Sequence, residues 1–155
     1  MSARRMICCL LFYLSLAPGL FYACATPVST APVDADQLLV PADKVEVVYF
    51  HRPRRCDACI YVEERVGYIV NTSFRDELAS GILTFEIFDL GDEENAAIAN
   101  KYGAIGSQLF INRIKDGVSH IRHIDRIWYW DCLDDQELFD KTVKDIIKQA
   151  LYGEG

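Results

Sequence analysis

The stretch YFHRPRRCDACIYVEERV, Tyr49 to Val66, places two cysteines two residues apart, directly after an apolar run and a cluster of arginines. The run itself, VEVVYF, is short, β-branched and aromatic, which is typical of a buried strand. After Cys56, apolar residues recur at intervals of three and four positions as far as Leu78, and Gly81 follows as a terminator. This pattern predicts a long helix, interrupted near residues 71–73. The cysteine pair is therefore expected where a strand passes into a helix.

The rest of the chain predicts an alternation of strands and helices. A strand over ILTFEIFDL precedes a helix over Asp92 to Tyr102, whose acidic start and basic end suit the helix dipole. Strands over Gln108 to Ile114 and over VSHIRHI flank the tight turn KDG, as in a hairpin. A final amphipathic helix begins with Asp134 and Glu137 at capping-box spacing. The expected order is βαβαββα, an α/β domain with a mixed central sheet and helices on both faces.

Length and charge limit the classes of function. A chain of 155 residues, 51% hydrophobic and 25% charged, can bury one core but hardly two, so one domain with appendages is expected. From Cys24 onward, 14 basic residues stand against 23 acidic ones, a net charge of −9. Binding to phosphates needs a dense basic face, so nucleic acid is not an expected partner.

The first 25 residues resemble an export signal, with two arginines ahead of an apolar run. Three possible fates of this segment remain open. Cys24 is a candidate for the lipid-modified first residue of a lipoprotein, the small residues around it suit simple cleavage, and the apolar run suits an uncleaved anchor. All three place the protein outside the cytoplasm, anchored to the cell membrane or, after cleavage, secreted or periplasmic. Residues 26–43 are expected to form a flexible linker to a domain at 44–155.

Three of the six cysteines lie in the signal or at its end, which leaves Cys56, Cys59 and Cys132 for the domain. A disulfide-stapled scaffold would have a larger and even number, so a structural framework is not expected. Two interpretations of the pair Cys56 and Cys59 remain open, an inert structural disulfide or a redox site. Cys132 is expected to be a partly buried thiol, with a third redox thiol or an intermolecular link as the alternatives.

A thiol at the first turn of a helix is easily ionised, because unpaired backbone N–H groups and the positive end of the dipole stabilise an anion. The thiolate is the nucleophile in disulfide exchange. Arg54 and Arg55 are expected to favour the thiolate of Cys56, whereas Asp57 opposes it. Cys59 lies nearly one turn further and among apolar neighbours. We therefore expect Cys56 to attack and Cys59 to resolve.

The order strand, CxxC, helix, strand, KYG, strand, KDG, strand, helix resembles the thioredoxin fold over roughly Lys44 to Tyr152. More narrowly, VYFHRPRRCDAC, FRDELASGILTFEIFDL and HIDRIWYW look like the nitrophenyl compound nitroreductase subunit ArsF family of small exported proteins. The resemblance implies a thioredoxin-like three-layer fold with the CxxC at Cys56 and Cys59. On this basis we expect thiol–disulfide exchange with a protein partner. No flavin or nicotinamide motif is found, so no nitroreductase chemistry and no cofactor are expected.

The chain departs from ordinary thioredoxins beside the cysteines. Arg55 replaces a tryptophan, the preceding strand lacks a buried acid, and Ser107 or its neighbour Gln108 holds the position of the proline that faces the disulfide. Because that proline also blocks metal binding, the pair has a second reading as a site for soft Cu(I) or Zn(II), assisted by His51 or Cys132. His51 is otherwise a polar strand-end residue or a proton-transfer partner. A third reading is a non-catalytic scaffold subunit of a membrane complex.

Overall fold

The computed structural model of the chain describes residues 41–153. Its strands and helices follow one another in this order: β1 (Lys44–His51), α1 (Asp57–Ser73), α2 (Arg75–Ser80), β2 (Leu83–Asp89), η2 (Glu93–Asn95), α3 (Ala96–Tyr102), β3 (Gln108–Lys115), β4 (Val118–Ile124), η3 (Arg126–Trp128), α4 (Trp130–Leu133) and α5 (Gln136–Tyr152).

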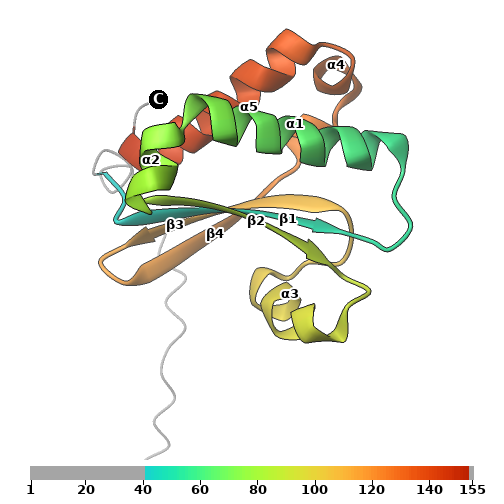
Figure 1. Cartoon of the computed structure of the whole chain (residues 1–155), viewed down its shortest axis with the longest axis horizontal. Coiled ribbons are helices and arrows are strands. Elements are labelled where there is room, and N and C mark those ends of the chain that lie inside the picture. Colours follow the sequence, from blue (N-terminus) through green and yellow to red (C-terminus); the bar gives the residue numbers. More distant parts are fainter. Residues whose placement is uncertain (1–40, 154–155) are drawn as a thin grey trace, which may run out of the picture. The chain divides into compact units, whose positions relative to one another are not determined.

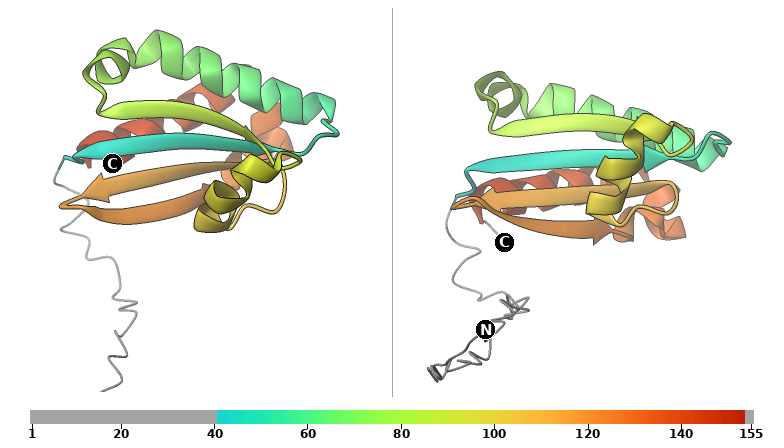
Figure 2. Two further views of the ribbon diagram at one scale, coloured as in Figure 1. Left: turned by 60° about the horizontal axis from the view of Figure 1, so that its bottom comes forward. Right: turned by 90° about the horizontal axis from the view of Figure 1, so that it is seen from below.

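The strands form one mixed sheet in the order β2-β1-β3-β4 (Figures 1 and 2). The central strand β1 runs parallel to β2 and antiparallel to β3, where Tyr49 pairs with Leu109. Strand β4 returns antiparallel to β3 through a hairpin whose turn holds Asp116 and Gly117 at φ values of 51° and 75°. Tyr49, Leu109 and Ile121 therefore lie on three neighbouring strands of one sheet.

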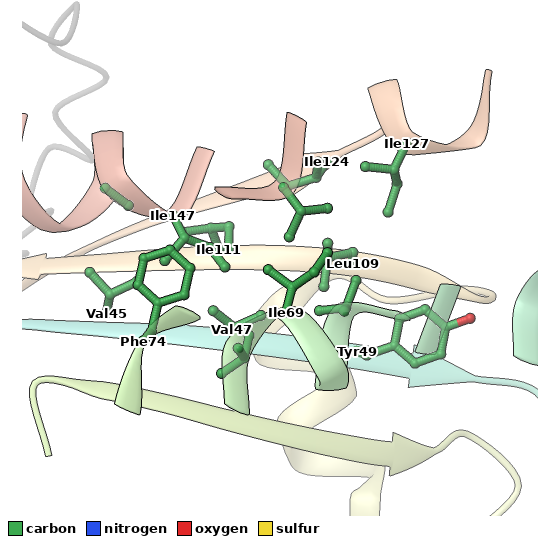
Figure 3. Packing of buried hydrophobic residues seen from close by; sticks show 14 of the residues in the cluster. Val45, Val47, Tyr49, Ile69, Phe74, Leu109, Ile111, Ile124, Ile127 and Ile147 are labelled. Carbon is green, nitrogen blue, oxygen red and sulfur yellow. The ribbon is translucent and has the colours of Figure 1, made fainter. Parts of the chain in front are cut away.

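Helices cover both faces of the sheet, as predicted. In Figure 1, α1 and α5 lie above the strands and α3 lies below them. Alternate residues of β1 therefore enter two different cores. Val47 and Tyr49 join the larger cluster with α1 and α5 (Figure 3), and Val48 and Phe50 join the smaller cluster beside α3. This order of elements, with its mixed sheet between helical layers, is the predicted thioredoxin-like α/β fold.

The first long helix is interrupted, as the sequence indicated. Helix α1 ends at Ser73, and Phe74 adopts φ −132° and ψ 39° before α2 begins. The Phe74 side chain is buried in the larger core (Figure 3), so packing of this ring accompanies the break in the helical backbone. Gly81 then ends α2 in the left-handed conformation, at φ 78°.

Two predicted helix starts differ in detail. The segment from Asp92 begins as the 3₁₀ turn η2, capped by the Asp92 side chain on the Glu94 N–H, and becomes α-helical only at Ala96. The predicted capping box at Asp134 and Glu137 is wrong: Asp135 caps α5 by accepting from the Leu138 N–H at 3.0 Å. Asp134 instead ends α4, so the cap of α5 shifts by one residue.

The predicted export signal, including Cys24, and residues 26–40 of the predicted linker lie outside the described residues. Ala42, two residues before β1, is buried in the domain. Its N–H donates to the carbonyl oxygen of Leu151 at 2.8 Å. Within residues 41–153, none of the helices combines the length and the apolar character needed to cross a bilayer.

Candidate functional site

A disulfide joins Cys56 and Cys59 where β1 leads into α1, with 5.0 Å between the two Cα atoms. Cys56 is the N-cap residue of α1, and its Sγ accepts the Cys59 N–H at 3.2 Å. Cys56 is exposed, whereas only 8% of Cys59 is accessible. Cys56, the exposed member of the pair, thus lies at the N-terminus of a 17-residue helix, where an anion is stabilised.

The segment between β1 and the disulfide is fastened to the loop that precedes β3. The Arg52 guanidinium donates to the carbonyl oxygen of Ile105 at 3.1 Å, from an element 53 residues away in the sequence. A Cβ on Gly106 would lie 3.3 Å from that guanidinium, so the absence of a side chain leaves room for it. This contact holds two loops together at the disulfide end of the sheet.

Tyr49 links the cysteine pair to the central strand of the sheet. Its hydroxyl donates to the carbonyl oxygen of Cys59 at 2.8 Å, and the residue is fully buried. Burial raises the pKa of Tyr49 to about 12; the negative charge of Glu63 adds to the rise, and the neighbouring Ser107 hydroxyl and Arg55 oppose it. Tyr49 therefore stays a neutral donor, and Ser107 lies close to it.

Arg55, which was expected to favour the Cys56 thiolate, forms an ion pair with Glu63. Its Nη2 lies 2.5 Å from Oε2 of Glu63 on α1, and both side chains are partly buried. Because the carboxylate compensates the guanidinium charge, the effect expected of Arg55 on the Cys56 thiol is reduced. Arg54 and Asp57, the other two charged neighbours, are both exposed. The helix N-terminus remains a feature from which stabilisation of a Cys56 thiolate is expected.

His51 and Cys132 are placed differently from the cysteine pair. His51 ends β1, and its Nδ1 lies 3.9 Å from Oδ1 of Asp89. Cys132 is fully buried in the larger core, and burial raises the pKa of its thiol. Within residues 41–153, no group of three or more His, Cys, Asp or Glu side chains is arranged to hold a metal ion. The structure therefore does not join these two residues with Cys56 and Cys59 in a metal centre.

Two contributors to the site were not identified from the sequence, Tyr49 and Glu63. Each carried a signal. Tyr49 occupies a core-facing position in the alternation of β1, yet it has a hydroxyl that must find a partner when buried. Glu63 follows Cys59 by four positions, a spacing that places two side chains on one helix face.

Comparisons with known proteins find similarity only among solved structures. No family model and no curated protein matches the chain. The zinc-bound form of human ERp44 matches with 16% identity over 74% of this chain and a TM-score of 0.43, and the chain spans 30% of that protein's length. A thioredoxin from Thermus thermophilus matches with 16% identity over 72% of this chain and 81% of its own, with a TM-score of 0.42.

At these identities and TM-scores the matches carry no inference about this chain. The narrower resemblance to the nitrophenyl compound nitroreductase subunit ArsF family is not supported, because no family model matches. Function has to be inferred from the cysteine pair and its surroundings.

Proposed function

We propose that this protein is a thiol–disulfide exchange protein that acts on protein partners through Cys56 and Cys59. One observation carries the proposal: the disulfide joins an exposed cysteine that caps a long helix to a second cysteine that is buried one turn further along that helix. An inert structural disulfide has no need of this asymmetry, whereas exchange needs one reachable sulfur and one shielded sulfur.

The exchange runs in two steps from the disulfide form seen here. A thiolate of the partner attacks Cys56 Sγ, the Cys56–Cys59 bond breaks, and Cys59 leaves as a thiolate that takes up a proton. A second partner thiol, after losing its proton, attacks the partner's own sulfur in the mixed disulfide and releases Cys56 as a thiolate. The partner gains a disulfide and loses two electrons, which the domain holds as two thiols. The reverse sequence reduces a partner disulfide.

Apolar side chains beside the pair suit contact with a polypeptide. Ile105, whose carbonyl oxygen holds Arg52, is 80% exposed, and Ile60 in the first turn of α1 is 37% exposed. Exposed apolar groups around a reactive centre are typical of a protein-binding surface. They support a protein substrate for the exchange.

An oxidising location agrees with this chemistry. The signal-like residues 1–25 suggest export, and Cys24 or the apolar run suggests attachment to the cell membrane. Replacing Cys24 by Ser and fractionating cells would separate the three fates. Release from the membrane would identify a lipid anchor, and retention of the intact chain would identify the apolar run as the anchor. If the unaltered protein and the Cys24→Ser variant both give a shortened, soluble product, the signal is removed by simple cleavage.

Trapping of partners tests the exchange activity. Cys59→Ser in the full-length chain is expected to accumulate mixed disulfides through Cys56, because no resolving thiol remains. Cys56→Ser is expected to abolish them, although Cys59 remains present as a matched thiol. The adducts are counted by non-reducing electrophoresis after acid quenching.

Other outcomes would favour the alternative functions. Equal trapping by the two variants, or none by either, would leave a structural disulfide or a scaffold subunit. Protection of both reduced thiols from alkylation until a chelator is added would favour a soft-metal module.

A further inference from the structure

One edge of the sheet is open along its last strand. The strand order β2-β1-β3-β4 places β4 (Val118–Ile124) at this edge, and within residues 41–153 no other strand pairs with its outer side (Figure 2). An edge strand presents a row of backbone N–H and C=O groups that can pair with a further extended chain. The outer side of β4 can therefore accept one more strand.

The hairpin determines which backbone groups of β4 point outward. Lys115 and Val118 pair across a two-residue turn in which both residues have positive φ, and such a turn closes on a hydrogen-bonded pair. Bonded and non-bonded pairs then alternate along the ladder. The next pair, Ile114 and Ser119, agrees with this alternation, because the Ile114 carbonyl oxygen accepts from Asp43 on the β1 side. The outward N–H and C=O groups therefore belong to Ser119, Ile121 and His123.

This edge strand is basic in an acidic protein. It contains His120, Arg122 and His123 and no acidic residue, whereas the whole chain has a net charge of −7. Side chains alternate along a strand, so His120 and Arg122 lie on the same face. Arg122 is exposed, and within residues 41–153 neither of these two side chains forms an ion pair. The acidic residues nearest in sequence, Asp116 and Asp125, lie beyond the two ends of the strand.

We propose that β4 binds an extended, acidic segment of a partner protein by strand addition. Main-chain hydrogen bonds to the outward groups of Ser119, Ile121 and His123 supply affinity, and the side chains supply specificity. Acidic side chains at alternate positions of the segment lie opposite His120 and Arg122, because opposite charges on neighbouring strands attract. An apolar side chain between them lies beside Ile121, on the other face of the sheet.

A second copy of β4 fits this edge less well. Pairing of two copies would bring the basic side chains at positions 120 and 122 close to their counterparts, and like charges on neighbouring strands repel. Charged side chains on an edge strand commonly prevent such self-pairing. The same charges attract an acidic chain, so the charge of this edge favours an acidic partner over a second copy.

The peptide acetyl-EVEVEVE-amide is the probe, and acetyl-KVKVKVK-amide is the control with the same alternation and the opposite charge. Each is titrated into the ¹⁵N-labelled, full-length chain. Saturable binding is expected for the acidic peptide alone, with slowed hydrogen exchange at the amides of Ser119, Ile121 and His123. The amides of His120 and Arg122 already face β3 and are expected to change less.

Modified peptides test the pairing of the backbone. In an extended chain the N–H groups of the glutamates point to one edge and those of the valines to the other. Methylation of all the valine nitrogens blocks one edge of the peptide, and methylation of all the glutamate nitrogens blocks the other. One of the two modified peptides is therefore expected to lose binding to β4 while the other retains it.

Two variants test the role of charge. Arg122→Glu reverses one charge on the edge strand and is expected to weaken binding of the acidic peptide about tenfold. Arg75→Glu makes the same change of net charge at an exposed position of α2, outside β4, and is expected to leave binding unchanged.

Several results would overturn the proposal. These are unchanged amide exchange along β4, equal binding of the acidic and basic peptides, retained binding by both methylated peptides, and equal weakening by Arg75→Glu and Arg122→Glu. Slowed exchange at the same three amides as the concentration of the chain alone rises would assign the edge to a second copy. Because trapping by Cys59→Ser does not depend on β4, failure here is distinguishable from failure of the exchange function.

Discussion

The phenol of Tyr49 donates a 2.8 Å hydrogen bond to the carbonyl oxygen of Cys59, from the central strand to the first turn of α1. Both residues are buried, so water does not compete for this bond. The buried half of the disulfide is in this way held against the sheet, while Cys56 projects to the surface at the helix N-terminus. A fixed resolving sulfur behind a reachable one is the arrangement on which the proposed exchange depends.

Tyr49→Phe removes this bond and keeps the ring in the core. The free energy of unfolding of the oxidised protein is expected to fall by about 1 kcal/mol, the usual contribution of one buried hydrogen bond. Urea denaturation measures it. Tyr68→Phe, at an exposed position of α1, is the control and is expected to have no effect. A loss of similar size in both variants would mean that the hydroxyl of Tyr49 contributes nothing specific.

Glu63→Gln is expected to lower the pKa of Cys56 in the reduced protein, because the Arg55 cation would lose its compensating carboxylate. The rate of alkylation by iodoacetamide, followed against pH, reports this pKa. Glu64→Gln removes the same charge at the adjacent, exposed position and serves as the control. If the two variants shift the pKa equally, net charge is responsible and the Arg55–Glu63 pair is not.

Glu46 is expected to make the domain sensitive to acid. Burial by itself would raise its pKa, but hydrogen bonds from Asn112, Lys44 and Tyr102 outweigh burial and lower the pKa to about 2. A carboxylate with a lowered pKa stabilises the folded state above its unfolded pKa, and that stability disappears as the pH falls towards the folded pKa. On the order of 2–3 kcal/mol should therefore be lost between about pH 5 and pH 2.

Denaturation curves recorded across this pH range test the role of Glu46. Glu46→Gln is expected to be less stable at pH 7 and to show a flatter dependence on pH below 5 than the unaltered protein. Glu64→Gln, at an exposed carboxylate of α1, is expected to keep the steep dependence. An unchanged slope in Glu46→Gln would show that other carboxylates govern the loss of stability.

Cys132 is expected to be unreactive in the folded protein. It is fully buried, and burial raises the pKa of its thiol, so little thiolate exists and reagents cannot reach it. After brief alkylation of the reduced native protein, mass spectrometry of peptides should find the label on Cys56 and none on Cys132. Labelling in urea provides the positive control. Native labelling of Cys132 would restore the reading of a third redox thiol.

Much of the fold follows from local sequence pattern. The β-branched run before Cys56, the spacing of apolar residues after it and the turn at Asp116 and Gly117 each specify a short element, and period and turn chemistry are local properties. The order of these elements and the rules of strand connection then restrict the sheet to few arrangements. The cysteine pair at the strand-to-helix junction was predicted by the same local reasoning, and the capping error at Asp134 came from a four-residue helix too short to have a periodic signal.

The rest of the site depended on residues that are distant in the chain. Tyr49 meets Cys59, and Arg52 meets Ile105, only because the sheet and α1 bring them together. The sequence shows that Arg55 lies beside the cysteines, but only the fold shows that its side chain pairs with Glu63. Composition and spacing determine which groups a chain can offer, whereas their charge compensation and burial are set by neighbours that only the folded chain supplies.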